Sequence, residues 1–105
     1  MPAAARASGR DTVFSLTGVG RGCGSPMNTV TGQGSPNVFV NGYGVVREGD
    51  EVGDHPARGC GPDDSPLTTF SSNVFINGRR AGRIGDKYTN DNTITSGSEN
   101  VFIGG

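Results

Sequence analysis

The sequence is poor in the residues that build a large hydrophobic core. Only 31% of its 105 residues are hydrophobic, and tryptophan is absent. A chain of this size forms a single domain, here residues 1–105, with a thin core that often needs a staple or a partner. Glycine is in excess instead, with 19 residues. Such a glycine content is also found in disordered chains, but ordered repeats favour a folded domain.

The sequence also lacks an excess of charge of one sign. Nine basic and ten acidic residues are dispersed along the chain and give a net charge of −1. Nucleic acids and anionic membrane surfaces are recognised by clustered basic residues, which this chain does not have. We therefore expect no nucleic-acid partner.

Signals for membranes and for export are missing as well. No apolar stretch approaches the roughly 18 residues of a membrane span, and residues 1–6 lack the apolar region of a secretory signal. With only two cysteines, a disulfide scaffold of the secreted kind is not indicated. We expect synthesis in the cytoplasm without a signal peptide, and export only as part of a larger assembly.

Three similar segments organise the chain. Residues 34–42, 71–78 and 97–104 each carry a Val-Phe-Val or Val-Phe-Ile triplet, and the triplets begin at positions 38, 74 and 101. Serine and asparagine precede each triplet, and Asn-Gly or Gly-Gly follows it. These are strand and turn signals, and Asn-Gly favours a tight hairpin. We expect the phenylalanines of the triplets, Phe39, Phe75 and Phe102, to form a core around a ring axis, the alternative being that they dock onto a partner.

A second element follows the first two triplets. Val45-Val46-Arg47 and Ala81-Gly82-Arg83 each precede a Gly-Asp pair at the same spacing, and we interpret them as returning strands that end in a turn. The third triplet lacks this partner, but Ala4-Ala5-Arg6, followed by Gly9-Arg10-Asp11, resembles it. If residues 4–6 pair with residues 101–103, the chain closes into three hairpins with pseudo-threefold symmetry.

The remaining residues, 12–33, 51–70 and 87–96, are predicted to be loops. They are rich in Gly, Pro, Ser, Thr, Asp and Asn, and no segment shows the period of a helix. Each loop leaves an equivalent turn, so all three should emerge from one side and converge on an apex. The predicted fold is all-β and loop-rich.

These residues resemble the PAAR-repeat family. Residues 2–6 approximate the Pro-Ala-Ala-Arg signature with one extra alanine, and the string Gly-Ser-Pro-Asn-Val-Phe-Val-Asn-Gly at 34–42 is typical of the family. The resemblance covers the whole chain and implies a small cone of three β-hairpin repeats. In contractile phage tails and type VI secretion systems, such a cone caps and sharpens the trimeric β-helical spike, a valine-glycine-repeat protein or its phage equivalent, one tip per trimer.

The resemblance implies a structural protein of a virion tail baseplate or an injection-system spike that touches the target membrane transiently. The residues do not distinguish the two systems, although the short length favours a phage tail. The alternative function is a small effector or adaptor module carried on the spike; a free-standing metal-binding protein is a third interpretation. We expect no enzyme, because a Cys60–His55 pair lacks an elbow or an oxyanion element and Asp63-Asp64 is typical of a solvated turn.

The resemblance also implies a metal ion near the apex, zinc or iron in its place, held by loop residues. A metal that clamps glycine-rich loops supplies folding energy that their small core lacks. The predicted ligands come from all three loops: Cys23, His55, Cys60 and Asp91.

This chain departs from the family pattern at Arg21, at Asp63-Asp64 and at Asn90-Asp91-Asn92. The fourth ligand is therefore open between Asp91, Asp63, a water molecule and none. A Cys23–Cys60 disulfide and two free thiols are the alternatives to a metal.

Overall fold

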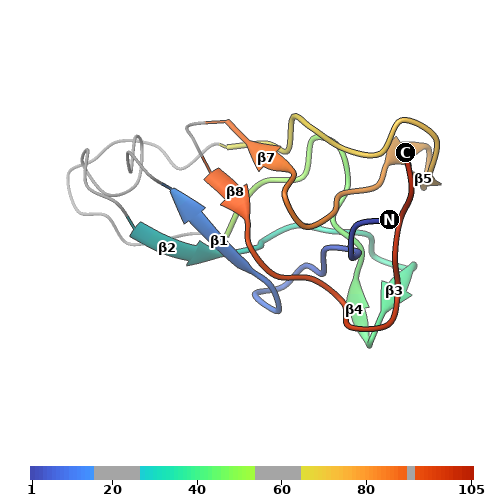
Figure 1. Ribbon diagram of the computed structural model, residues 1–105, viewed down its shortest axis with the longest axis horizontal. Coiled ribbons are helices and arrows are strands. Elements are labelled where there is room, and N and C mark those ends of the chain that lie inside the picture. Colours follow the sequence, from blue (N-terminus) through green and yellow to red (C-terminus); the bar gives the residue numbers. More distant parts are fainter. Residues whose placement is uncertain (16–26, 54–64, 90–91) are drawn as a thin grey trace.

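The computed structural model describes residues 1–15, 27–53, 65–89 and 92–105, and all its regular elements there are β-strands (Figure 1). The all-β prediction is confirmed for this part of the chain. None of the described residues belongs to a helix long and apolar enough to cross a membrane.

One antiparallel sheet joins strands from the two ends of the sequence. Its order is β2-β1-β8-β7, with bounds Thr12–Ser15 for β1, Met27–Val30 for β2, Lys87–Tyr88 for β7 and Asn92–Ile94 for β8. Val13 lies opposite Ile94 in the register, and both side chains are buried. The prediction that residues 12–33 and 87–96 are loops is wrong for these strands. Their two to four residues are too few for alternation to stand out from a Thr- and Asn-rich background.

Two short hairpins form the opposite end of the molecule. Strand β3 (Phe39–Val40) pairs with β4 (Tyr43–Gly44), and β5 (Phe75–Ile76) pairs with β6 (Arg79–Arg80). In each turn the Asn-Gly pair has positive φ at both residues, as a type I′ turn requires. The predicted hairpins are therefore present, but their returning strands lie two residues before Val45-Val46-Arg47 and Ala81-Gly82-Arg83.

Those two segments pair with each other and with the N-terminal segment instead. Isolated antiparallel bridges join Arg6 to Val45, Arg47 to Ala81 and Arg83 to Ala4. The middle residues close a ring of backbone hydrogen bonds. The Val46 amide donates to the Ala5 carbonyl at 3.0 Å, Gly82 donates to Val46 at 2.7 Å, and Ala5 donates to Gly82 at 3.1 Å. This closed ring is the pseudo-threefold arrangement.

The ring separates two small core layers. Its middle residues Ala5 and Val46 pack with the inner face of the four-stranded sheet, where Leu67 and Tyr88 are also buried. The residues one position earlier, Ala4, Val45 and Ala81, pack with Val40 and Ile103 of the hairpin end. At position 82 a Cβ would lie 2.8 Å from the Leu67 side chain, so any larger residue there would displace that side chain.

The N-terminal segment takes the place of the missing returning strand of the third repeat. Ala3 forms an antiparallel bridge with Phe102, and the Ala4 amide donates to the Val101 carbonyl at 2.9 Å. Equivalent bonds run from Val45 to Val38 and from Ala81 to Val74. The pairing thus lies near residues 3–4 and not along the whole of 4–6, because Arg6 pairs with Val45.

An arginine and an aspartate close the turn that follows each ring segment. In residues 47–50 and 83–86 the aspartate accepts from the backbone amide and from the guanidinium of the arginine three positions earlier. Gly49 and Gly85 adopt φ values of 81° and 88°, which explains the glycine before each aspartate. The first turn has two extra residues but keeps the contacts, with Arg6 Nη2 2.8 Å from Asp11 Oδ1.

The Arg6–Asp11 pair is the most enclosed of these, since the Asp11 side chain is fully buried. Burial raises the pKa of the Asp11 carboxyl, but hydrogen bonds from the Arg6 guanidinium, the Arg6 amide and the Ser96 hydroxyl together outweigh it. The pKa of Asp11 therefore lies below its ordinary value. Ionised Asp11 contributes stability that is present above its unfolded-state pKa and is lost as the pH falls towards its folded-state pKa.

We expect Asp11→Asn to lower the free energy of unfolding by about 3 kcal/mol at neutral pH, because it leaves the buried Arg6 guanidinium without its counterion. Because the pKa of Asp11 is depressed, the loss should shrink on acidification below about pH 4. Urea unfolding of both proteins from neutral to acidic pH measures this. Parallel pH profiles for the variant and the parent would contradict the role given to Asp11.

Candidate docking surface

The phenylalanines of the three triplets are exposed side chains at the hairpin end of the molecule. Phe39, Phe75 and Phe102 have exposed fractions of 58%, 55% and 50%. Strands β3 and β5 and the C-terminal segment lie at the end opposite the four-stranded sheet (Figure 1). The structure thus presents one exposed phenyl ring from each repeat at one end.

The prediction that these phenylalanines form the core is wrong. Successive side chains of a strand point to opposite faces, and the hairpin layer of the core takes the neighbouring residues Val40, Ile76 and Ile103. Because all three positions of each triplet are apolar, alternation could not identify the buried face. Their exposure is compatible with the alternative expectation, that these phenylalanines dock onto a partner.

A serine at an equivalent position holds the segment that enters each triplet. The hydroxyl oxygens of Ser35, Ser71 and Ser98 accept the amide of the first valine of the triplet at 2.9 to 3.0 Å. All three serines are buried. The three phenylalanines therefore follow identical local turns, which makes their positions equivalent around the pseudo-threefold axis.

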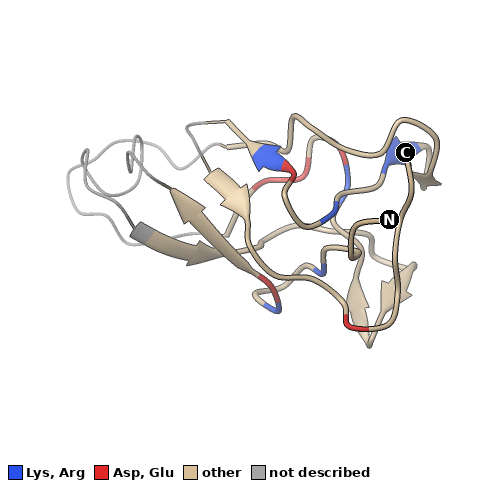
Figure 2. Ribbon diagram, in the orientation of Figure 1, with Lys and Arg blue, Asp and Glu red and all other residues tan. Residues whose placement is uncertain are grey.

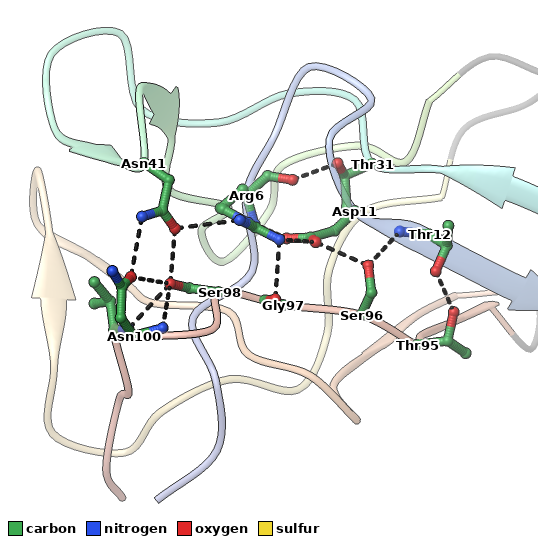
Figure 3. A network of polar contacts seen from close by, with 11 residues as sticks. Arg6, Asp11, Thr12, Thr31, Asn41, Thr95, Ser96, Gly97, Ser98 and Asn100 are labelled. Atoms are coloured by element: carbon green, nitrogen blue, oxygen red, sulfur yellow. Dashed lines mark hydrogen bonds and ion pairs between the residues drawn. The ribbon is translucent and has the colours of Figure 1, made fainter.

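A polar clamp joins the first hairpin to the third repeat (Figure 3). Asn41 Oδ1 accepts from Arg6 Nη1 at 3.2 Å and from the Ser98 hydroxyl at 2.7 Å, and its amide nitrogen donates to Asn100 Oδ1 at 3.0 Å. The same arginine donates to the carbonyl of Gly97 at 2.9 Å. The clamp thus connects the β3–β4 hairpin to the Arg6–Asp11 ion pair.

The clamp recurs at the second hairpin but not at the third repeat. Asn77 Oδ1 accepts from Ser35 at 2.6 Å and from Arg47 at 3.3 Å. In the third repeat Gly104 takes the asparagine's place, and only its backbone carbonyl accepts from Ser71, at 2.6 Å. The surface is therefore threefold in its phenylalanines but not in the contacts that support them.

The predicted metal ligands Cys23, His55, Cys60 and Asp91 lie outside the described residues, as does the alternative ligand Asp63. Within the described ranges no group of three or more His, Cys, Asp or Glu side chains is suited to hold a metal ion. The structure therefore leaves both the ligand set and the proposed disulfide as predictions.

The described residues that border segments 16–26, 54–64 and 90–91 lie close to one another. Ser15 lies opposite Met27 and Asn92 in the sheet register. The Gly53 amide donates to Val30, and the Thr89 amide donates to Pro66. The points at which the chain leaves the described part are thus gathered around the four-stranded sheet, away from the exposed phenylalanines.

Charge does not distinguish the two ends. Figure 2 shows basic and acidic residues dispersed along the described chain, and the aspartates of the turns lie beside arginines. The distinctive feature of the hairpin end is therefore its exposed apolar side chains, as expected of a protein-binding surface.

Comparison with known proteins identifies the repeats. A family model described as the PAAR motif matches residues 23–96. Two Pseudomonas aeruginosa proteins are each 36% identical to the chain over 106 residues: the NAD(P)(+) glycohydrolase toxin Tse6 of strain PAO1 and the (p)ppApp synthetase toxin Tas1 of strain UCBPP-PA14. The alignment covers 92% of this chain but 22% of either toxin, so the chain spans about a fifth of their length.

We expect Phe39→Ala, Phe75→Ala and Phe102→Ala each to change the free energy of unfolding by less than about 1 kcal/mol, because each ring is half exposed. Val40→Ala, the matched control one residue from Phe39, should cost about 2 kcal/mol since that side chain is buried. Urea unfolding compares the four variants. A larger loss for the phenylalanine variants than for Val40→Ala would place the rings in the core after all.

Proposed function

Because the chain belongs to the PAAR family, we propose that it is the structural tip of a contractile injection machine, seated on the end of a trimeric β-helical spike. The observation that carries this proposal is the threefold set of exposed phenylalanines at one end. A single chain with three equivalent contact points matches a partner made of three identical chains. The tip would cap and sharpen the spike for membrane piercing, without catalysis of its own.

The support for the partner is geometric. Aromatic side chains that are exposed in the free protein and rigidly held are the residues that most often dominate a protein interface. Here the serine turns hold all three phenylalanine-bearing segments before any partner binds, and asparagine clamps hold the first two hairpins as well. Docking would therefore order few new side chains, which lowers its entropic cost.

The two toxin relatives support a second function on the same surface. Both are named as toxins, and this chain matches only 22% of each. We infer that a PAAR domain of this kind serves as the module by which such a protein is carried on the spike. This agrees with the alternative of an effector or adaptor module and favours a bacterial injection system over a phage tail.

The test is direct binding to a spike trimer of the valine-glycine-repeat type from the same genome. Native mass spectrometry should find one chain per trimer. The triple variant Phe39→Ser/Phe75→Ser/Phe102→Ser should bind more than about 100-fold more weakly, because aromatic anchors contribute 2 kcal/mol or more each.

The matched control replaces two exposed apolar residues outside the triplets, Val30→Ser with Ile84→Ser, and should bind like the parent. Circular dichroism and urea unfolding must show that both multiple variants are folded. Unchanged affinity of the folded triple variant would contradict the docking surface, and a stoichiometry other than one to three would contradict the cap.

A zinc ion clamping the opposite end remains part of the proposal, with Cys23, His55, Cys60 and Asp91 as its ligands and iron as the other metal to consider. Its support is the sequence and the grouping of the flanking residues around the sheet. The two cysteines, one histidine and an acid are a donor set that suits zinc.

We expect about one zinc per chain by elemental mass spectrometry and two free thiols in the unfolded protein, with Cys60→Ser losing the metal and lowering the unfolding temperature. Asp91→Asn tests the fourth ligand. No metal together with no free thiols would indicate that a Cys23–Cys60 disulfide joins the two loops in place of a metal.

A further inference from the structure

The described arginines divide into two groups. Arg6, Arg47, Arg79 and Arg83 each form an ion pair with an aspartate: Asp11, Asp50 or Asp86. Arg10 and Arg80 form no ion pair with any residue that the structure describes, and Arg80 is exposed on β6. Glu48 accepts the backbone amide of Arg80 at 3.2 Å, but its carboxylate is not within ion-pair distance of the guanidinium.

The Arg80 guanidinium lies over two aromatic rings. Its carbon lies 5.8 Å from the ring centre of Phe75 and 5.6 Å from that of Phe70. Phe75 is directly opposite Arg80 in the register of the β5–β6 hairpin, and it is one of the three docking phenylalanines. A fixed positive charge therefore lies beside one of the three contact points.

This placement constrains the partner. When an apolar surface covers Phe75, it also removes water from the neighbouring guanidinium. Burying an arginine without an anion or another acceptor is costly, whereas a carboxylate offers two oxygens that match the guanidinium fork. Because the two rings already hold the arginine, forming such a pair orders little further side-chain freedom.

We propose that the spike end fitting this surface carries an acidic side chain at its rim, and that Arg80 pairs with it. The inference rests on the proposed docking function and adds the partner's chemistry and a specificity-determining residue. The spike repeats the acid three times around its axis, and the tip engages one copy.

The other two contact points carry no equivalent charge. The residue opposite Phe39 is Gly44, and the residue opposite Phe102 is Ala3. Position 44 also has no room for a side chain, since a Cβ there would overlap the backbone carbonyl oxygen of Ser35. Among the described residues directly opposite the three phenylalanines, Arg80 in the second repeat is thus the charged one.

Arg10 provides a matched control. Its guanidinium lies over the ring of Tyr43 at 5.9 Å, so it too is an arginine stacked on an aromatic side chain. It lines a shallow polar hollow together with Glu99, however, so a carboxylate of the same chain is already close by. A partner's acid is not needed there.

The experiment measures the affinity of the tip for the purified valine-glycine-repeat spike trimer at low and high salt, about 50 and 500 mM sodium chloride. Arg80→Gln should weaken binding about tenfold at low salt and reduce the salt dependence, because one desolvated charge pair is removed. Arg80→Lys should keep most of the salt dependence, and Arg10→Gln should behave like the parent. Each acid at the rim of the spike is then replaced by its amide. The acid that pairs with Arg80 is the one whose replacement weakens binding of the parent tip but does not weaken binding of Arg80→Gln any further.

Two results would overturn the inference: unchanged affinity and salt dependence of folded Arg80→Gln, or an equal loss with Arg10→Gln. If either occurs while the triple phenylalanine variant still fails to bind, docking stands and the acidic partner is wrong. If the triple variant also binds normally, the docking surface itself is wrong.

Discussion

The structure depends on three backbone hydrogen bonds that run in a circle. Ala5, Val46 and Gly82 each donate to one ring neighbour and accept from the other, so no pair of segments is complete without the third. The strands of the hairpins have only two residues each, and such short pairs are not stable alone in water. The ring supplies the cooperativity that the hairpins lack, because it fixes where each of them begins.

The ring explains which residue types recur in the three repeats. Small apolar residues occupy it because three backbones approach one another closely. An arginine must follow, because the turn beyond the ring uses its guanidinium and its amide to hold the aspartate that ends the turn. Stability is thus concentrated in polar contacts around a small core, an arrangement that suits a narrow object with little interior. Outside the ring, apolar side chains are exposed, as the three phenylalanines are.

Local signals in the sequence predicted the local structure well. Asn-Gly at 41–42 predicted a tight turn because few other residue pairs favour positive φ twice in succession. The spacing of arginine before Gly-Asp predicted a turn, although not the ion pair within it. The pairing partners of the strands could not be predicted from local signals. Val45-Val46-Arg47 is equally suited to a hairpin or to the ring, and the two differ only in which distant segments come together. The buried face of the triplets could not be predicted, because all three positions of each triplet are apolar.

The circular pairing also has a consequence for how the protein is made. Ala4 pairs with Arg83 and bonds to Val101, so segments separated by about 80 to 97 residues must both be synthesised before the ring can close. Until residue 83 emerges, the ring is open and its segments expose unpaired amides and carbonyls. Contacts of such long sequence separation form slowly, and open strand edges are sites of association with other chains. A nascent chain can close the ring only after residue 83 has emerged, and we expect little stable structure in residues 1–83 before that point.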